Sequence, residues 1–101
     1  MQELTLLSRN PLMFGLSGEI DSQNADEFYE TVATEYAKAP ADVVFECKKL
    51  EFIDSTTLGT FVKLFKRVRE DGHRMTLRGL QPRLKKLFVI CALDTVMEIV
   101  E

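Results

Sequence analysis

The segment FIDSTTLG, residues 52–59, marks the point where an apolar run passes into a helical pattern. Apolar residues then recur at the spacing of one helix face, at Leu58, Phe61, Val62, Phe65 and Val68. A Ser directly before such a pattern predicts a helix N-cap, whose oxygen accepts from the first free backbone N–H groups. The Ser55 hydroxyl would then lie at the positive end of the helix dipole, where a phosphoryl group is favoured. A plain cap and a phosphate acceptor are both compatible with this pattern.

The sequence before this segment predicts two strands, a helix and a third strand. Alternating apolar residues predict strands over 3–7 and 12–18, joined by a turn at Asn10-Pro11. Asp21 or Ser22 is expected to cap a helix over 24–38. The run Val43-Val44-Phe45 is typical of a buried strand, after which residues 47–54 lead to the second helix.

The sequence after the segment predicts the second helix over 56–71, ended by Gly72, and a strand over 75–79. A third helix with Pro82 in its first turn and a last strand over 96–100 complete the chain. The order β-β-α-β-α-β-α-β predicts an α/β fold with a mixed, mostly parallel sheet of about five strands. We expect the helices mainly on one face of this sheet, in a single domain over residues 1–101.

Composition argues against several classes of protein. The net charge of −3 gives no general reason for binding nucleic acid or an anionic membrane. No apolar run approaches the roughly 18 residues that cross a bilayer, and the N-terminus does not resemble a signal peptide. Cys47 and Cys91 have no metal-site or redox-pair spacing, so we expect two reduced, buried thiols in a cytoplasmic protein.

Charge is distributed unevenly along the chain. Residues 1–62 carry four basic and eleven acidic side chains, whereas residues 63–86 carry nine basic and two acidic ones. The basic segment spans a helix, a strand and the start of another helix, so its side chains need not form one patch. Two explanations are open: the charged faces are simply solvated, or the surface has an acidic and a basic region that orient a binding partner.

The chain contains no sequence motif of a known catalytic or cofactor site. A GxSxG elbow, a phosphate-binding P-loop and a dinucleotide fingerprint are all absent, and the acidic residues are too scattered to indicate a metal. The single histidine, His73, is expected in a turn. Asp21 and Asp54 both precede helices at the same end of the predicted sheet, so they either flank one surface with Ser55 or simply cap their helices. A small enzyme using these three residues is the least favoured interpretation.

Several short motifs in the same order resemble one family over nearly the whole chain. Gly18-Glu19-Ile20-Asp21 with Ala25 resembles its first loop, and residues 44–55 resemble its central strand and phosphorylation loop. Leu58-Gly59 resembles the first turn of its second helix. The C-terminal part resembles the family's third-helix and last-strand pattern at Pro82, Arg83, Leu87, Phe88, Leu93, Asp94 and Val96. The chain thus resembles the STAS domain family, and most of all its free-standing bacterial anti-sigma factor antagonists.

The resemblance implies a regulatory role rather than an enzyme, with no cofactor and no metal. Such antagonists bind an anti-sigma factor that is also a serine/threonine kinase, phosphorylation releases them, and a cognate phosphatase restores binding. By motif position, the resemblance implies that Ser55 is the phosphoacceptor. It places the partner interface at Asp21, Asp54, Thr56, Thr57 and Gly59.

The chain departs from the family pattern at a few positions. Thr57 stands where a small residue is usual, which adds bulk and a second candidate acceptor beside Ser55. Many relatives carry a fourth helix after the last strand, so the apolar surface left here is expected to be covered by a partner or by a weak homodimer. The alternative function is a STAS subunit of a larger assembly, such as an ABC-type lipid transport complex, that binds protein without phosphorylation.

Overall fold

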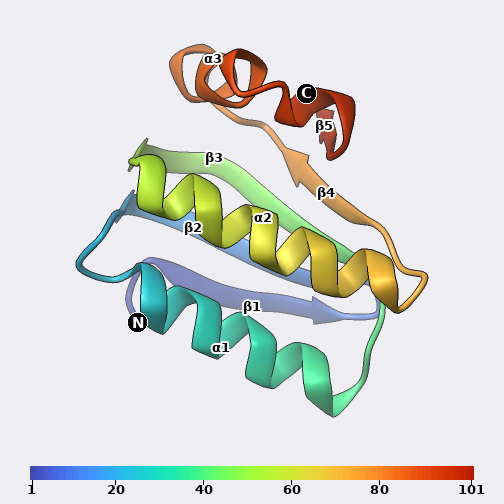
Figure 1. The fold of residues 1–101 in the computed structure, drawn as a ribbon. Coiled ribbons are helices and arrows are strands. Elements are labelled where there is room, and N and C mark those ends of the chain that lie inside the picture. Colours follow the sequence, from blue (N-terminus) through green and yellow to red (C-terminus); the bar gives the residue numbers. More distant parts are fainter.

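The computed structural model describes residues 1–101 and contains five strands and three α-helices (Figure 1). In chain order the elements are β1 (Leu4–Arg9), β2 (Leu12–Ile20), α1 (Ala25–Lys38), β3 (Val43–Ile53), α2 (Ser55–Glu70), β4 (Met75–Arg78), α3 (Pro82–Ile90), the 3-10 turn η1 (Leu93–Thr95) and β5 (Glu98–Val100). The predicted order of strands and helices is confirmed. No helix combines the length and apolar character needed to cross a membrane.

The five strands form one sheet in the order β1-β2-β3-β4-β5. Strands β1 and β2 are an antiparallel hairpin, and every other neighbouring pair is parallel. The mixed, mostly parallel sheet expected from the sequence is therefore confirmed.

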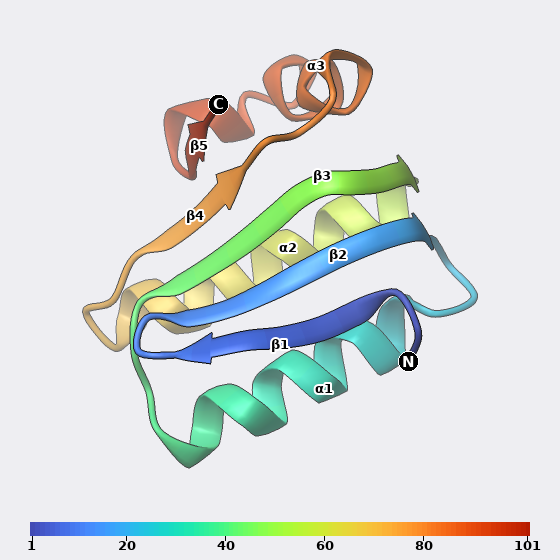
Figure 2. The ribbon, with the colours of Figure 1, turned by 180° about the vertical axis from the view of Figure 1, so that it is seen from behind.

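All three helices cover the same face of the sheet. Each parallel crossover steps to the next strand in the same direction, so three right-handed connections place their helices on one side. Helices α1 and α2 lie in front of the sheet in Figure 1, and Figure 2 shows the opposite face free of helices. Helix α3 packs beside α2, since the rings of Phe88 and Phe61 lie 5.7 Å apart.

A connected group of phenylalanines fills the space between the sheet and the helices. Phe45, from the central strand β3, contacts Phe14 of β2, Phe28 of α1 and Phe61 of α2, with ring centroids 5.4–5.9 Å apart. These rings and Phe88 are almost completely buried. Edge-to-face and offset packing of such rings adds to the stabilisation from apolar burial. These rings thus hold β2, β3, α1 and α2 against one another.

Two elements differ from the prediction. Strand β3 continues through the segment expected to be a connection, because two register irregularities against β2 interrupt the simple alternation of apolar and polar residues. The last strand is shorter than expected, because the backbone N–H groups of Val96 and Met97 donate to the Leu93 carbonyl and only Glu98–Val100 pair with β4.

The two cysteines have different environments. Cys47 is fully buried in β3, and burial raises the pKa of its thiol from an ordinary 9.0 to about 12. Cys91 is exposed, so the expectation that both thiols are buried is wrong for this residue. It directly follows the last turn of α3, beyond the stripe that Leu84 and Phe88 bury.

Candidate functional site

The loops that follow β2 and β3 meet at one end of the sheet. Ile20 and Ile53, the last residues of these parallel strands, are paired in the sheet register. One residue beyond Asp21, the Ser22 backbone N–H donates to Asp54 Oδ2 over 2.8 Å. The predicted meeting of the two acidic loops beside Ser55 is therefore confirmed. We call residues 20–24 and 54–57 the switch corner.

Asp54, and not Ser55, caps helix α2. Its backbone is extended (φ −118°, ψ −175°), and its Oδ1 accepts from the Thr57 backbone N–H over 3.0 Å. Ser55 is the first helical residue, and its hydroxyl makes none of the hydrogen bonds that build the corner. The predicted Ser cap is thus wrong, because the carboxylate one residue earlier reaches the free N–H first. This leaves the Ser55 hydroxyl free on an exposed residue.

The hydrogen bonds to Asp54 keep it ionised. The Thr57 backbone N–H lowers the pKa of this carboxyl most, followed by the Ser22 backbone N–H and the Thr57 hydroxyl, while partial desolvation opposes them. Donors that bind the charged form stabilise it relative to the acid. A fixed negative charge therefore stands one residue before Ser55 at neutral pH.

Thr57 is a structural residue of the switch corner. It is fully buried, and its Oγ1 lies 2.5 Å from the Ile20 carbonyl oxygen and 3.0 Å from Asp54 Oδ1. Its hydroxyl proton thereby ties the start of α2 to the end of β2. The expectation of a second accessible acceptor at this position, available to a partner, is wrong. The Thr57 side chain, which is larger than the residue usual in the family at this position, thus joins the two loops.

Asp21 lies in the same corner and is half-buried. Its Oδ1 accepts from the Gln23 backbone N–H over 2.9 Å, and its own backbone N–H donates to Asn24 Oδ1 over 2.8 Å. Asn24, rather than Asp21 or Ser22, occupies the N-cap position of α1, and no side chain caps that helix. Asp21 therefore shapes the loop that meets Asp54 instead of capping.

The exposed residues of the corner share one surface at the start of α2. Ser55, Thr56 and Gly59 are all exposed, and Ser55 and Gly59 are four residues apart, which places them on the same helix side. A Cβ added at Gly59 would meet no atom within 4 Å, so the helix surface is flat and open there. The backbone can thus be approached closely beside the Ser55 hydroxyl.

His73 lies far from the switch corner. It follows the end of α2, where its Nδ1 is 3.5 Å from Asp42 and its ring packs against Tyr36. The 16 residues of α2 separate it from Ser55, which at 1.5 Å per residue is about 24 Å. The structure therefore does not bring the single histidine to Ser55.

Sequence reasoning missed Phe52 as a surface residue. Its side chain is 43% exposed, whereas the next residue, Ile53, is buried. The sequence offered two signals, the neighbouring Glu51 and the apolar Leu50. They place Phe52 on the opposite side of the strand from Leu50 and Ile53 only when the irregular register of β3 against β2 is known.

The chain belongs to the STAS domain family, because the family model matches residues 5–101. It is similar to an anti-sigma-B factor antagonist of Bacillus subtilis, with 34% identity over 92 residues, 91% of this chain and 84% of that relative.

Two solved structures of the anti-sigma factor antagonist SpoIIAA share the fold. The unphosphorylated form has a TM-score of 0.76 at 17% identity, covering 97% of this chain and 86% of that chain. The phosphorylated form, from Bacillus, has a TM-score of 0.73 at 19% identity, covering 97% and 89%. The sheet and helices described above are thus those of a known fold.

Proposed function

We propose that this STAS domain is an anti-sigma factor antagonist. It captures an anti-sigma factor that is also a serine kinase, and phosphorylation of Ser55 ends the capture. A cognate phosphatase would restore the active form, and all of these proteins would meet in the cytoplasm. The observation that carries the proposal is the Ser55 hydroxyl, which is exposed and free of intrachain hydrogen bonds on a rigidly bonded corner.

A phosphate on Ser55 is compatible with the folded domain. The first backbone N–H groups of a helix have no intrahelical partner, and here Asp54 accepts only from Thr57 among them. The N–H groups of Ser55 and Thr56 therefore remain available, and the helix dipole favours an anion at this end. The similar TM-scores of this chain to both forms of SpoIIAA agree with a fold that persists in the phosphorylated state.

The switch must then act at the docking surface. A phosphoserine adds about 1.5–2 negative charges, next to an ionised Asp54 and in the same corner as Asp21. A partner that fits the flat surface at Gly59 would meet both bulk and repulsion. A cost of about 3 kcal/mol weakens binding more than 100-fold, which is sufficient for release.

The direct test measures binding of the purified anti-sigma factor kinase from the same cell by calorimetry. Ser55→Asp should bind more than about 100-fold more weakly than wild type, and Ser55→Ala should bind with the wild-type affinity. Thr34→Asp places the same charge on an exposed position of α1 and serves as the matched control, with unchanged binding.

Thermal unfolding of each variant shows that the fold is retained. Incubating wild type with the kinase and ATP, followed by phosphosite mapping, should find phosphate on Ser55 and none on the buried Thr57. A Ser55→Asp protein that binds as tightly as wild type contradicts the proposed switch. Wild type that captures no kinase contradicts the antagonist role itself.

A further inference from the structure

Phe52 stands out among the exposed apolar side chains of the molecule. The large apolar residues that reach the surface are Leu6, Leu7, Phe52, Val89, Ile90, Val96 and Val100. Phe52 is the only aromatic among them, and it lies in the last residues of β3, directly before the switch corner. Exposure of a phenyl ring to water is unfavourable, so burial of this ring by a partner would favour binding.

The irregular register of β3 turns Phe52 outward. Gly18 pairs with Leu50 and Glu19 with Phe52, so β3 has one extra residue, Glu51, at this point. Such a bulge re-aims the side chains of its strand. Leu50 and Ile53 both point into the core, and Phe52 between them remains 43% exposed.

Phe52 and Ser55 are close enough to contact one partner. Three residues of chain span at most about 11 Å when fully extended. A standard protein interface covers about 800 Å² on each partner, which is roughly 30 Å across. A protein that docks on Ser55 and extends over the end of β3 can therefore reach Phe52 as well.

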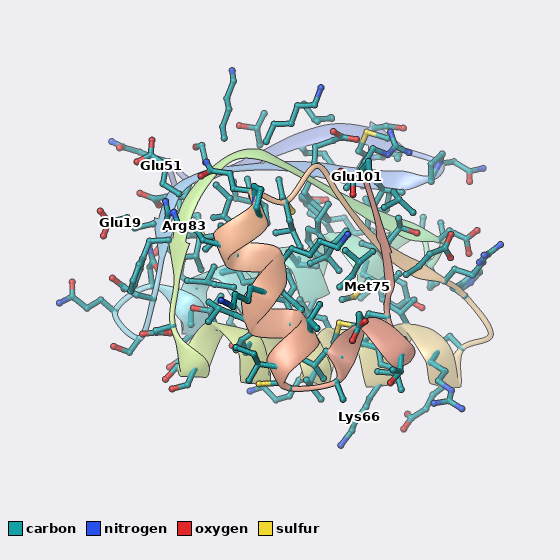
Figure 3. All side chains as sticks on the ribbon, turned by 90° about the horizontal axis from the view of Figure 1, so that it is seen from above. Glu19, Glu51, Lys66, Met75, Arg83 and Glu101 are labelled. Carbon is teal, nitrogen blue, oxygen red and sulfur yellow. The ribbon has the colours of Figure 1, made fainter.

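Two acidic residues neighbour this aromatic residue, one along the chain and one across the sheet. Glu19 is its sheet neighbour and Glu51 its chain neighbour. Figure 3 shows Glu19, Glu51 and Arg83 at the end of the molecule where α2 begins. The start of α3 is held near β3 because Gln81 Nε2 donates to the Leu50 carbonyl over 3.2 Å. An aromatic side chain inside a polar rim is the usual composition of a binding hot spot.

We propose that Phe52 is the apolar anchor by which this domain holds the anti-sigma factor kinase. The inference rests on the proposed function and assigns separate roles in it to Phe52 and Ser55. Phe52 supplies affinity by entering an apolar pocket of the partner, and Ser55 controls whether the two surfaces can close. The phosphate need not touch the ring, because charge repulsion beside it is enough to keep the pocket from reaching it.

The test compares Phe52→Ala with Val96→Ala. Val96 is 51% exposed and lies beside Arg69, His73 and Arg74, at the opposite end of the sheet from Ser55. Phe52→Ala should weaken calorimetric binding of the purified kinase about 30-fold, and Val96→Ala should change it less than about 2-fold. Phe52→Tyr keeps the ring and should bind at least about 10-fold more tightly than Phe52→Ala.

Phosphorylation kinetics give a second readout that loss of folding would not reproduce. With Phe52→Ala as substrate of the kinase, the KM should rise about 30-fold while kcat stays within about 2-fold of wild type. A residue that only anchors the complex changes binding and leaves the transfer step alone. Thermal unfolding should remain close to that of wild type, because the ring is half-exposed.

The outcomes separate this inference from the proposed function. If wild type captures the kinase and Phe52→Ala captures it equally well, the anchor is refuted and the Ser55 switch stands. The same holds if Val96→Ala loses as much affinity as Phe52→Ala. If the wild-type chain does not bind the kinase at all, both the Phe52 anchor and the proposed antagonist function are refuted.

Discussion

The switch corner and the C-terminal segment, residues 82–101, are held in place by different forces. The corner is fixed by directional hydrogen bonds, from the Ser22 N–H and the Thr57 N–H to Asp54 and from the Thr57 hydroxyl to the Ile20 carbonyl. In the C-terminal segment, the apolar side chains of Leu84, Phe88 and Met97 attach α3 and η1 to the core, and β5 pairs with β4. Several of its other apolar residues, Val89, Ile90, Val96 and Val100, remain exposed.

This difference suits the two regions to different tasks. Hydrogen bonds specify orientation, so the corner can hold the backbone at Ser55 in a fixed position while the Thr57 hydroxyl is bonded and the Ser55 hydroxyl stays free. Apolar contacts are not directional, so they hold α3 against the sheet without defining each surface position as closely, whereas β5 is paired to β4 by backbone hydrogen bonds.

The largest expected effect is on the apolar attachment. Phe88→Ala should lower the free energy of unfolding by about 3–5 kcal/mol, because the ring is fully buried against Phe61. Amide exchange in β5 should accelerate more than exchange in β2. Val89→Ala, at the exposed neighbour, should cost less than about 0.5 kcal/mol in the same urea titration. Equal losses for the two variants would mean that Phe88 does not anchor this segment.

The next effect distinguishes two adjacent threonines of the corner. Thr57→Val should destabilise the protein by about 1–3 kcal/mol, because it leaves the buried Ile20 carbonyl without the hydroxyl donor. Thr56→Val makes the same change on an exposed side chain and should stay within about 0.5 kcal/mol of wild type. Chemical denaturation of both variants measures this contrast, which disappears if the corner does not depend on the Thr57 bond.

A smaller effect concerns acid stability. Because the folded-state pKa of Asp54 lies below its ordinary value of 3.8, the carboxylate adds stability that is fully present above pH 3.8. This stability is lost as the pH falls through the lower folded-state pKa. Asp54→Asn retains one acceptor oxygen, so we expect it to lower the urea midpoint at pH 7 and to flatten this part of the pH profile.

Urea midpoints measured from pH 7 down to pH 2 test the acid effect. An Asp54→Asn profile as steep as that of wild type would show that the corner carboxylate is not the group responsible.

The smallest effect on stability is expected at the exposed thiol. Cys91→Ser should leave the unfolding midpoint within experimental error, because this side chain lies at the surface. In the native wild-type protein, a thiol reagent at pH 8 should label Cys91 quickly. Cys47 should react only on unfolding, since it is buried and its pKa is raised to about 12. Fast labelling of two thiols per chain would contradict the buried position of Cys47.

Much of the fold was predictable because its signals are local. Apolar periodicity placed α1 and α2 to within about two residues, and turn residues such as Gly72 marked their ends. The motif around Asp54 and Ser55 correctly predicted that a helix begins there, although residues 47–53 before it were expected to be a connection and belong to β3. The same reasoning failed for β3, where a bulge opposite Gly18 breaks the alternation on which strand prediction depends.

The sequence by itself determined the order of elements, the mixed sheet and the position of Ser55 where a helix begins, because these follow from propensity and periodicity along the chain. Only the tertiary structure decided which hydroxyl is free. Ser55 is exposed while Thr57 is buried, because Ile20 and Ser22, more than 30 residues earlier, supply the groups that bond to the corner. The exposure of Phe52 was likewise set by the register against β2, which no pattern within β3 can encode.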